Sequence, residues 1–222
     1  MSIERINDFA ADPKLQRVKA PIYRHGGKRA LDIALVLAAL PIVFFTVGLI
    51  ALVMLIIERA NPFYSQLRVG KGGSAFRIWK LRTMVPNADE MLESYLAANP
   101  AARLEWDRSQ KLTDDPRITL MGRFLRQTSL DELPQLWNVL AGDMSLVGPR
   151  PMMLDQQKLY PSNAYYRLRP GLTGPWQVSA RHLSAFADRA RFDDAYDASL
   201  TLSGDVALLF KTVRVVLRGT GC

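Results

Sequence analysis

The pattern of apolar and polar positions is dominated by one uncharged run, Ile33 to Ile57, which contains 25 residues and a single proline, Pro41. A straight helix of that length would measure about 38 Å, more than the roughly 30 Å of a bilayer core. Because proline removes a helical hydrogen bond, we expect a kink or a break there, and neither piece, about 12 and 24 Å long, would span alone. The run is therefore a kinked spanning helix or a helix–break–helix that enters the membrane and returns.

Basic residues flank this run on both sides and favour the second alternative. The cytoplasmic flanks of membrane helices are rich in Lys and Arg. The basic residues near the run are Lys14, Arg17, Lys19, Arg24, Lys28 and Arg29 before it, and Arg59, Arg68, Lys71, Arg77, Lys80 and Arg82 after it. A spanning helix would place one flank outside, whereas a re-entrant helix keeps both inside. We predict a basic N-terminal arm at 1–29 and a re-entrant membrane helix at 30–58, kinked at Pro41.

The remaining segment, 59–222, alternates short strand patterns with helical ones and is long enough for one domain with its own core. Two segments, Phe63–Arg68 and Ala75–Leu81, flank a glycine-rich turn and predict a β-hairpin. Helical spacing predicts helices at 87–110 (broken at Asn99-Pro100), 133–140, 153–168 and 203–218, with a loop at 170–181. The predicted fold class is α+β and mainly helical, with a re-entrant membrane helix and a small cytoplasmic domain.

The last predicted helix combines an apolar face with basic residues, Lys211, Arg214 and Arg218. This composition suits an interfacial amphipathic helix that lies on an anionic membrane surface. A helix packed in the core of the domain explains the apolar positions equally well.

Composition narrows the classes of function. The net charge of +8 suits anionic lipids, nucleotide phosphates or nucleic acid as partners. The basic residues are spread along the chain, an acidic segment at 87–107 intervenes, and no nucleic-acid-binding module is recognised, so we expect no nucleic-acid partner. The single cysteine, Cys222, excludes a disulfide framework and is compatible with a reducing cytoplasm. The sequence contains no P-loop, zinc-ligand spacing or dinucleotide fingerprint.

The first candidate for chemistry is the segment Ser129-Leu130-Asp131-Glu132. Ser-x-x-Glu is typical of a helix capping box, and acidic residues in a first helical turn are stabilised by the helix dipole. In the functional alternative, backbone N–H groups and the dipole lower the pKa of Asp131, and its carboxylate attacks phosphorus as a nucleophile. Glu132 beside it would help to hold Mg²⁺ together with substrate phosphates.

The second candidate is a set of basic residues. Arg123 and Arg126 precede the acidic pair, Arg150 stands between two prolines that fix its backbone, and Lys80 and Arg82 share one face of the second strand. Arginine binds phosphate oxygens through two parallel hydrogen bonds and stays charged. The alternative is a solvated or lipid-facing basic surface.

The third candidate is the loop from Arg169 to Arg181, whose glycines permit close approach of the backbone to a ligand. Trp176, Gln177 and Arg181 could contact a base or a sugar, whereas a structured turn around a buried tryptophan is the alternative. Further along, Asp193, with Asp194 and Asp197, could add a carboxylate to a metal or nucleotide site, although an acidic helix face is the commoner explanation of such a cluster.

Together these motifs resemble the bacterial sugar transferase family, the small monotopic phosphoglycosyl transferases. The resemblance runs from about Lys28 to the C-terminus. It rests on Lys28-Arg29-x-x-Asp32, Phe76-x-x-x-Lys80-x-Arg82-Thr83-Met84, Asp114-Asp115-Pro116-Arg117-Ile118-Thr119, Gly122-x-x-x-Arg126, the long segment Ser129 to Pro151, and the loop Arg169 to Arg181. The segment from Ser129 to Pro151 is the most specific of these.

The resemblance implies transfer of a sugar-1-phosphate from a UDP-sugar to undecaprenyl phosphate, with release of UMP. Asp131 would be the nucleophile that forms a phosphosugar–enzyme intermediate, and Mg²⁺ would neutralise the diphosphate beside Asp131 and Glu132. Lys80, Arg126, Arg150 and Asp193 fall at family active-site positions, and Arg169, Gln177 and Arg181 belong to the family's loop.

The family's membrane segment is re-entrant, so the resemblance implies a monotopic protein of the bacterial inner membrane with its active site on the cytoplasmic face. The chain is similar to the short form found in exopolysaccharide clusters. The sequence gives neither the sugar nor the oligomeric state, for which a homodimer is one option. A non-catalytic, membrane-anchored adaptor of a polysaccharide assembly complex is the rival hypothesis, and it would not need Asp131.

Overall fold

The two longest strands form the β-hairpin that the sequence predicts. The computed structural model describes residues 22–109, 112–179 and 186–217. In it, β1 (Phe63–Val69) pairs antiparallel with β2 (Ala75–Leu81), and the turn η2 (Lys71–Gly73) joins them. Gly72 and Gly73 have φ angles of 71° and 83°, a left-handed conformation that glycine adopts without strain.

The pleat of β2 decides which side chains face the protein interior. Phe76 and Ile78 are buried on one face, and Lys80, two residues further along, lies on the same face and is partly buried. Asn138 holds this strand against the helix α6 (Gln135–Ala141), because its side chain accepts a hydrogen bond from the N–H of Trp79 (3.1 Å) and donates one to the carbonyl of Arg77 (2.8 Å).

Helices make up most of the rest of the described chain, as the fold class predicts. The helices are η1 (Tyr23–Gly27), α2 (Lys28–Glu58), α3 (Ala88–Ala98), α4 (Pro100–Ser109), α5 (Leu120–Thr128), η3 (Leu130–Glu132), α6 (Gln135–Ala141), η4 (Asp155–Leu159), α7 (Ala164–Arg167), α8 (Pro175–Ser179), η5 (Phe186–Asp188), α9 (Arg189–Ala198) and α10 (Leu202–Leu217). The predicted helix at 87–110 is found as α3 and α4, and the predicted break falls between them.

Two sequence predictions are wrong in part. The helix expected at 153–168 is only the short η4 and α7, separated by a segment that contains Pro161, which cannot donate a backbone hydrogen bond. The loop expected at 170–181 contains β4 (Gly171–Thr173) and α8. Strands and helices of three to five residues are too short to produce a periodic pattern.

Strand β4 pairs in parallel with β3 (Ser145–Val147), and the two form a second small sheet. The backbones approach closely next to this pair: a Cβ on Gly148 or Gly171 would collide with the other segment's main chain. Glycine at both positions therefore permits the contact, and it brings the segment with Arg150 beside the segment that begins at Arg169.

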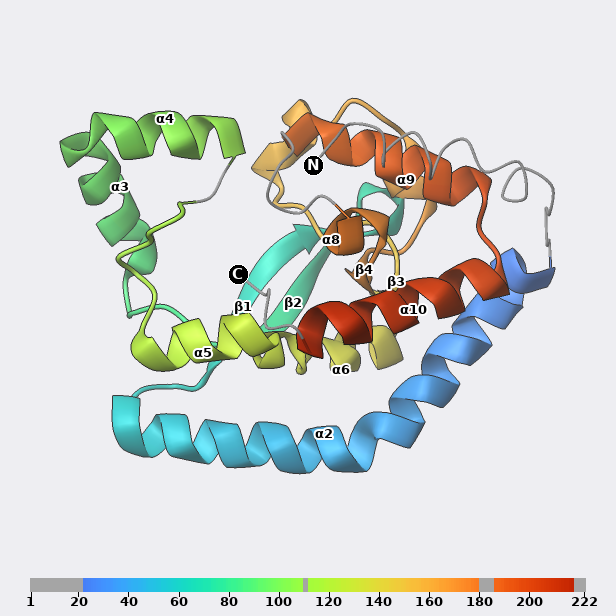
Figure 1. Cartoon of the computed structure of the whole chain (residues 1–222), viewed down its shortest axis with the longest axis horizontal. Coiled ribbons are helices and arrows are strands. Elements are labelled where there is room, and N and C mark those ends of the chain that lie inside the picture. The colour runs from blue at the N-terminus through green and yellow to red at the C-terminus, as the bar shows by residue number, and fades with distance from the viewer. Residues whose placement is uncertain (1–21, 110–111, 180–185, 218–222) are drawn as a thin grey trace.

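Helix α2 carries the apolar run as a single 31-residue helix with Pro41 inside it. Figure 1 shows it bending partway along its length, which is the expected consequence of an internal proline. The helical conformation continues through the bend, so the structure has one bent helix in place of the predicted helix–break–helix. The re-entrant topology stays a prediction.

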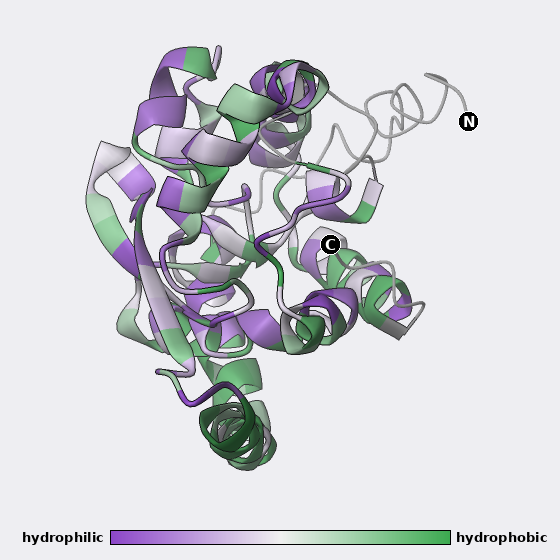
Figure 2. Ribbon diagram, turned by 90° about the vertical axis from the view of Figure 1, so that its left-hand side faces the viewer, coloured by the Kyte–Doolittle hydropathy of each residue, from purple (hydrophilic) through white to green (hydrophobic). Residues whose placement is uncertain are grey.

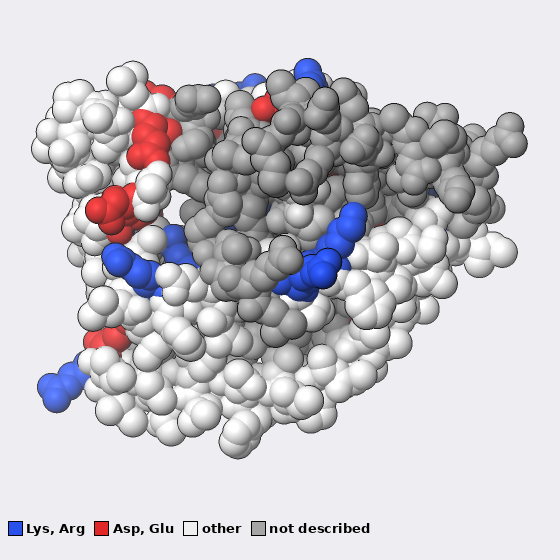
Figure 3. All heavy atoms as spheres, in the orientation of Figure 1, with Lys and Arg blue, Asp and Glu red and all other residues white. Residues whose placement is uncertain are grey.

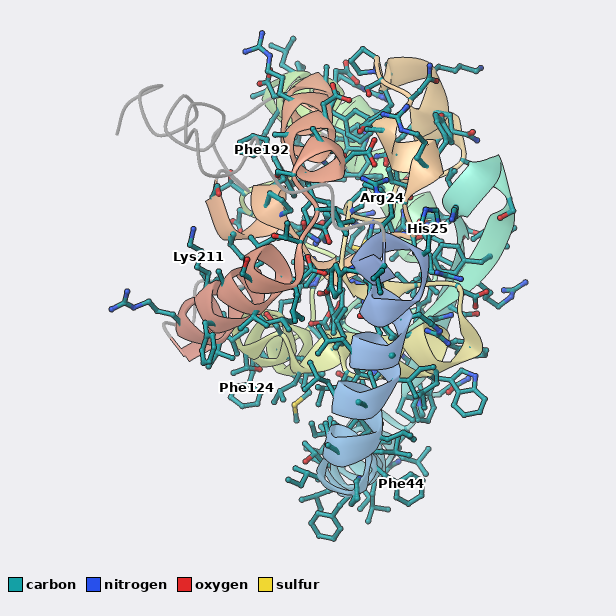
Figure 4. All side chains as sticks on the ribbon, turned by 90° about the vertical axis from the view of Figure 1, so that its right-hand side faces the viewer. Arg24, His25, Phe44, Phe124, Phe192 and Lys211 are labelled. Atoms are coloured by element: carbon teal, nitrogen blue, oxygen red, sulfur yellow. The ribbon has the colours of Figure 1, made fainter. Side chains whose placement is uncertain are left out.

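Most of the apolar surface of α2 is left uncovered by the other described residues. Ile42, Phe44 and Phe45 are 74%, 80% and 73% exposed. Figure 2 shows α2 as an apolar helix set apart below the rest of the protein, and Figure 4 shows Phe44 pointing away from it. Within the described residues, the stretch Tyr23–Glu58 is the one helix long and apolar enough to cross a membrane. Such a large exposed apolar surface is suited to lipid.

A buried carboxylate, Asp205 of α10, attaches the start of the membrane helix to the body of the protein. Tyr23 and Lys28 both donate hydrogen bonds of 2.6 Å to its Oδ2 atom, and Tyr196 of α9 donates one of 2.6 Å to its Oδ1 atom. Asp205 is 1% exposed, so these donors replace the water that its charge has lost.

Helix α10 combines the two alternatives that the sequence left open. Leu208 is buried against the body, whereas Phe210 and Val213 are 73% and 56% exposed. Figure 4 shows Lys211 extending away from the body, and Figure 3 shows basic side chains over α10 and acidic ones over α3 and α4. One face of α10 is therefore a core face, and its membrane contact stays a prediction.

We expect that replacing Pro41 with alanine straightens α2 and changes its topology, because alanine restores the missing backbone hydrogen bond. Single cysteines introduced as His25→Cys and Ala60→Cys, in a Cys222→Ser background, can be labelled in spheroplasts with a membrane-impermeant maleimide. Both should be protected in the parent and one should become labelled in Pro41→Ala, while Leu40→Ala should behave like the parent. Protection of both positions in Pro41→Ala would show that the proline does not set the topology.

Candidate active site

Asp131 and Glu132 lie in the short 3₁₀ turn η3, between α5 and α6. Ser129 ends α5 in a left-handed conformation (φ 57°), and its side chain makes no capping hydrogen bond. The capping-box explanation is therefore wrong. A side-chain cap of this kind is found at the N-terminal end of α5, where the hydroxyl of Thr119 accepts a hydrogen bond of 2.9 Å from the N–H of Gly122.

Lys80 reaches both members of the acidic pair from β2. Its Nζ atom lies 2.7 Å from Oε1 of Glu132 and 3.8 Å from Oδ2 of Asp131. The hairpin and the turn η3 are far apart in sequence, so it is the packing of α6 on β2 that brings this cation to the two carboxylates.

Burial raises the pKa of Asp131, which is 6% exposed. The charge of Glu132 raises it further, whereas Lys80, Arg126 and Arg150 lower it. The expectation that a helix dipole lowers this pKa is therefore wrong. The acidic pair does not occupy the first turn of a long helix, and the loss of solvent around Asp131 has the largest effect on its pKa. The neighbouring cations favour the ionised form of the carboxylate and offset part of the effect of burial.

Two predicted arginines flank the pair. Arg126 donates from Nε to the hydroxyl of Thr83 (2.9 Å), and Nη2 of Arg150 lies 3.8 Å from Oε1 of Glu132. Together they line a cleft of about 1150 Å³ with Asp131 in its wall. Other residues of that wall include Lys80, Arg117, Arg123, Glu132, Trp176 and Gln177. Segments from four parts of the sequence thus converge on one concave surface, on which Lys80, Arg126 and Arg150 surround Asp131 and Glu132.

Two predicted residues do not meet the acidic pair, and a third, Arg181, cannot be compared. Arg169 does not line the cleft, and its Nε atom donates to the carbonyl of Gly142 (2.8 Å) at the C-terminal end of α6. Asp193 is buried in α9 and accepts a hydrogen bond of 2.7 Å from Tyr160. Arg181 lies outside the described residues.

Sequence reasoning missed two arginines that border the site, Arg68 and Arg189. Both line a smaller cavity that adjoins the cleft and shares Arg68, Lys80, Glu132 and Arg150 with it. For Arg68 a signal existed: residues paired across a hairpin share a face, and Arg68 pairs with Phe76, on the face of Lys80. Nothing in the sequence pattern distinguishes Arg189 from the other basic residues of its helix.

The chemistry of the acidic pair fits Mg²⁺ but not a metal held by protein alone. The described residues contain no group of three or more His, Cys, Asp or Glu side chains arranged for a metal. Mg²⁺ is commonly held by one or two carboxylates together with substrate phosphates, and Asp131 and Glu132 provide those two.

These features describe a class of protein: a domain with one long apolar helix and a cleft in which basic side chains gather around a buried carboxylate, an arrangement suited to phosphorylated ligands. The family model of the bacterial sugar transferases matches residues 23–219, and the chain belongs to this family.

Three relatives illustrate the similarity. An undecaprenyl-phosphate galactose phosphotransferase of Salmonella typhimurium is 52% identical over 160 residues, covering 71% of this chain and 34% of its own length. A UDP-galactose-lipid carrier transferase of Erwinia amylovora is 41% identical over 220 residues, covering 96% and 46%. The exopolysaccharide production protein ExoY of Sinorhizobium fredii is 42% identical over 200 residues, covering 87% of each chain. The chain thus spans less than half of the length of the first two relatives and most of the third.

The pKa of Asp193 leads to a prediction about stability. Burial raises it to about 7, so between pH 4 and 7 the folded protein holds a proton that the unfolded chain has lost. Stability should fall as the pH rises through that range, by roughly 4 kcal/mol at about 1.4 kcal/mol per pKa unit. Asp193→Asn should remove most of this loss, because asparagine stays neutral and still accepts the hydrogen bond of Tyr160.

Thermal unfolding of the full chain in detergent micelles at pH 5 and pH 8 measures this difference. The matched control is Asp194→Asn, at the exposed neighbouring residue. Between pH 5 and pH 8 this variant should lose as much stability as the wild type. Equal losses in Asp193→Asn and the wild type would contradict the prediction.

Proposed function

We propose that this protein transfers a sugar-1-phosphate from a UDP-sugar to undecaprenyl phosphate and releases UMP, the first membrane step in building an exopolysaccharide or another glycoconjugate. The observation that carries the proposal is the buried Asp131 in the wall of the cleft, beside Glu132 and Lys80. Membership of the sugar transferase family and the names of the relatives support the same substrates.

The reaction would take place in two steps. A carboxylate oxygen of Asp131 attacks the sugar-side phosphorus of the UDP-sugar, forming a new P–O bond. The bond to the bridging oxygen breaks, and UMP leaves with the electron pair. A phosphate oxygen of undecaprenyl phosphate then attacks the same phosphorus and restores the free carboxylate of Asp131, which gives ping-pong kinetics.

The cations around Asp131 would serve both steps. Lys80 and Arg126 lower the pKa of Asp131 against the effect of its burial, and with Arg150 they would offset the charge that develops on the phosphate oxygens. Asp131 and Glu132 would hold Mg²⁺, which neutralises diphosphate charge when it is bound.

Location at the membrane fits the acceptor, a lipid phosphate. Helix α2 would sit in the bacterial inner membrane as a re-entrant, monotopic anchor, with the cleft on the cytoplasmic side. Exposed apolar side chains outside α2, among them Phe124, Trp137 and Phe210, would contact the membrane surface, and the basic charge of the chain would favour anionic lipids.

Asp131→Asn should abolish transfer, lowering the rate by roughly 1000-fold or more, because the amide cannot act as the nucleophile. The measurement is UMP release from a panel of UDP-sugars with undecaprenyl phosphate and Mg²⁺. The UDP-sugar that supports UMP release also names the donor. Asp107→Asn, which neutralises an exposed carboxylate of α4 outside the cleft, is the matched control and should keep full activity.

Intact-protein mass spectrometry tests the covalent step separately. Wild type incubated with the donor alone should gain the mass of one phosphosugar and release one equivalent of UMP, and Asp131→Asn should do neither. Near-normal turnover of Asp131→Asn would show that Asp131 is not the nucleophile. Failure of the wild type to release UMP from any donor that it binds would favour the adaptor hypothesis.

A further inference from the structure

Three arginines from distant segments converge on the smaller cavity beside the cleft. Arg68 comes from β1, Arg150 from the segment after β3, and Arg189 from the start of α9. The cavity has a volume of about 120 Å³, and its charged lining residues are Arg68, Lys80, Glu132, Arg150 and Arg189. Four cations thus surround a small space that contains one carboxylate.

The positive charge of this cavity is not neutralised within the described structure. Its one carboxylate, Glu132, already lies 2.7 Å from Lys80 and 3.8 Å from Arg150. In the described residues, neither Arg68 nor Arg189 has a carboxylate within 4.0 Å. Buried charges without a partner are costly, so this arrangement favours an anion in the cavity.

Arg189 is held in position by packing rather than by hydrogen bonds. It is 9% exposed, its guanidinium lies 4.2 Å from the ring centre of Trp176 and 4.5 Å from that of Phe186, and its buried Nε has no hydrogen-bond partner in the described structure. Stacking uses the faces of a guanidinium and leaves the N–H groups at its edge for planar recognition of an oxyanion.

The charges of these arginines also oppose one another. Burial and, after it, the nearby charge of Arg150 lower the pKa of Arg68 to about 10 and that of Arg189 to about 9, although the charge of Asp193 raises that of Arg189. The guanidinium groups still carry their charge at neutral pH. An anion bound among them would relieve this repulsion.

The position of the cavity favours a soluble anion over a lipid head group. Arg68 lies next to Val69, which packs in a cluster with Tyr165 and Phe186. The membrane helix packs near the opposite end of the hairpin, where Leu81 contacts Met54 of α2. Figure 1 shows β1 rising from that end, away from the part of α2 that runs beneath the body.

We propose that Arg68 and Arg189, together with Arg150, form a second anion site that holds the nucleotide-side phosphate of the substrate. The assignment rests on the proposed function. Lys80 and Arg150 line both cavities, so one diphosphate can place its sugar-side phosphate beside Asp131 and its nucleotide-side phosphate in the second site. The same arginines would hold the phosphate of UMP after the first step.

The test compares the binding of UMP and uridine to the full chain in lipid nanodiscs, for wild type, Arg68→Gln and Arg189→Gln. Because uridine lacks the phosphate, the ratio of the two dissociation constants isolates the contribution of this group. The wild type should bind UMP more tightly than uridine, and each substitution should reduce the ratio by about ten-fold or more, since a charge-assisted hydrogen bond is lost. Arg77→Gln, an exposed charge on the same hairpin, should leave the ratio within about two-fold of the wild type.

Unchanged ratios in both arginine variants would overturn the proposal. Arg68→Gln decides the result if Arg189→Gln does not fold, and the uridine affinity of each variant shows whether the rest of the site is intact. An increase in the KM for undecaprenyl phosphate, with an unchanged ratio of UMP to uridine binding, would assign the site to the lipid phosphate and also overturn the proposal.

The proposed function can fail independently of this site. A wild type that releases no UMP from any UDP-sugar contradicts the function, whereas turnover by a wild type whose arginine variants keep the normal binding ratio contradicts the second anion site alone.

Discussion

The structure depends on how a membrane helix is fixed to a polar domain, and the buried carboxylate of Asp205 supplies that attachment. It accepts hydrogen bonds from Tyr23 and Lys28 at the start of the membrane helix and from Tyr196 of α9. Removing one partner of a buried ionic cluster leaves uncompensated charge, so the cluster fixes its members in one arrangement. The body is thereby held within the angle of the bent helix, and the cleft keeps a set position relative to the apolar surface of α2 (Figure 1).

Electrostatic balance governs the cleft in the same way. Burial raises the pKa of Asp131, and the basic side chains around it oppose that effect. The excess of positive charge is largest in the adjoining cavity, where Arg68 and Arg189 lack carboxylate partners among the described residues. In this cavity the cations repel one another, and a bound phosphate would neutralise their charge. The site is preorganised for an anion, because the cations need no rearrangement when it binds.

The limits of sequence reasoning are visible in particular residues. The hairpin could be predicted because alternation and a glycine turn are local signals, and the apolar run was evident from composition alone. The convergence of Lys80, Arg126 and Arg150 on the acidic pair came from resemblance to a family, since no local pattern links these positions. The same resemblance grouped Arg169 and Asp193 with the site, whereas the structure places Arg169 against the C-terminal end of α6 and Asp193 against Tyr160.

The sequence by itself determined the elements whose signals are periodic or compositional: the membrane helix, the hairpin, the broken helix at 87–110 and the basic character of the chain. Only the tertiary structure decided that the side chain of Ser129 makes no capping hydrogen bond, that the pKa of Asp131 is raised, and that Arg68 and Arg189 share a cavity. The physical reason is that burial and long-range charge depend on which segments pack together, and periodicity along one segment carries no information about its neighbours in space.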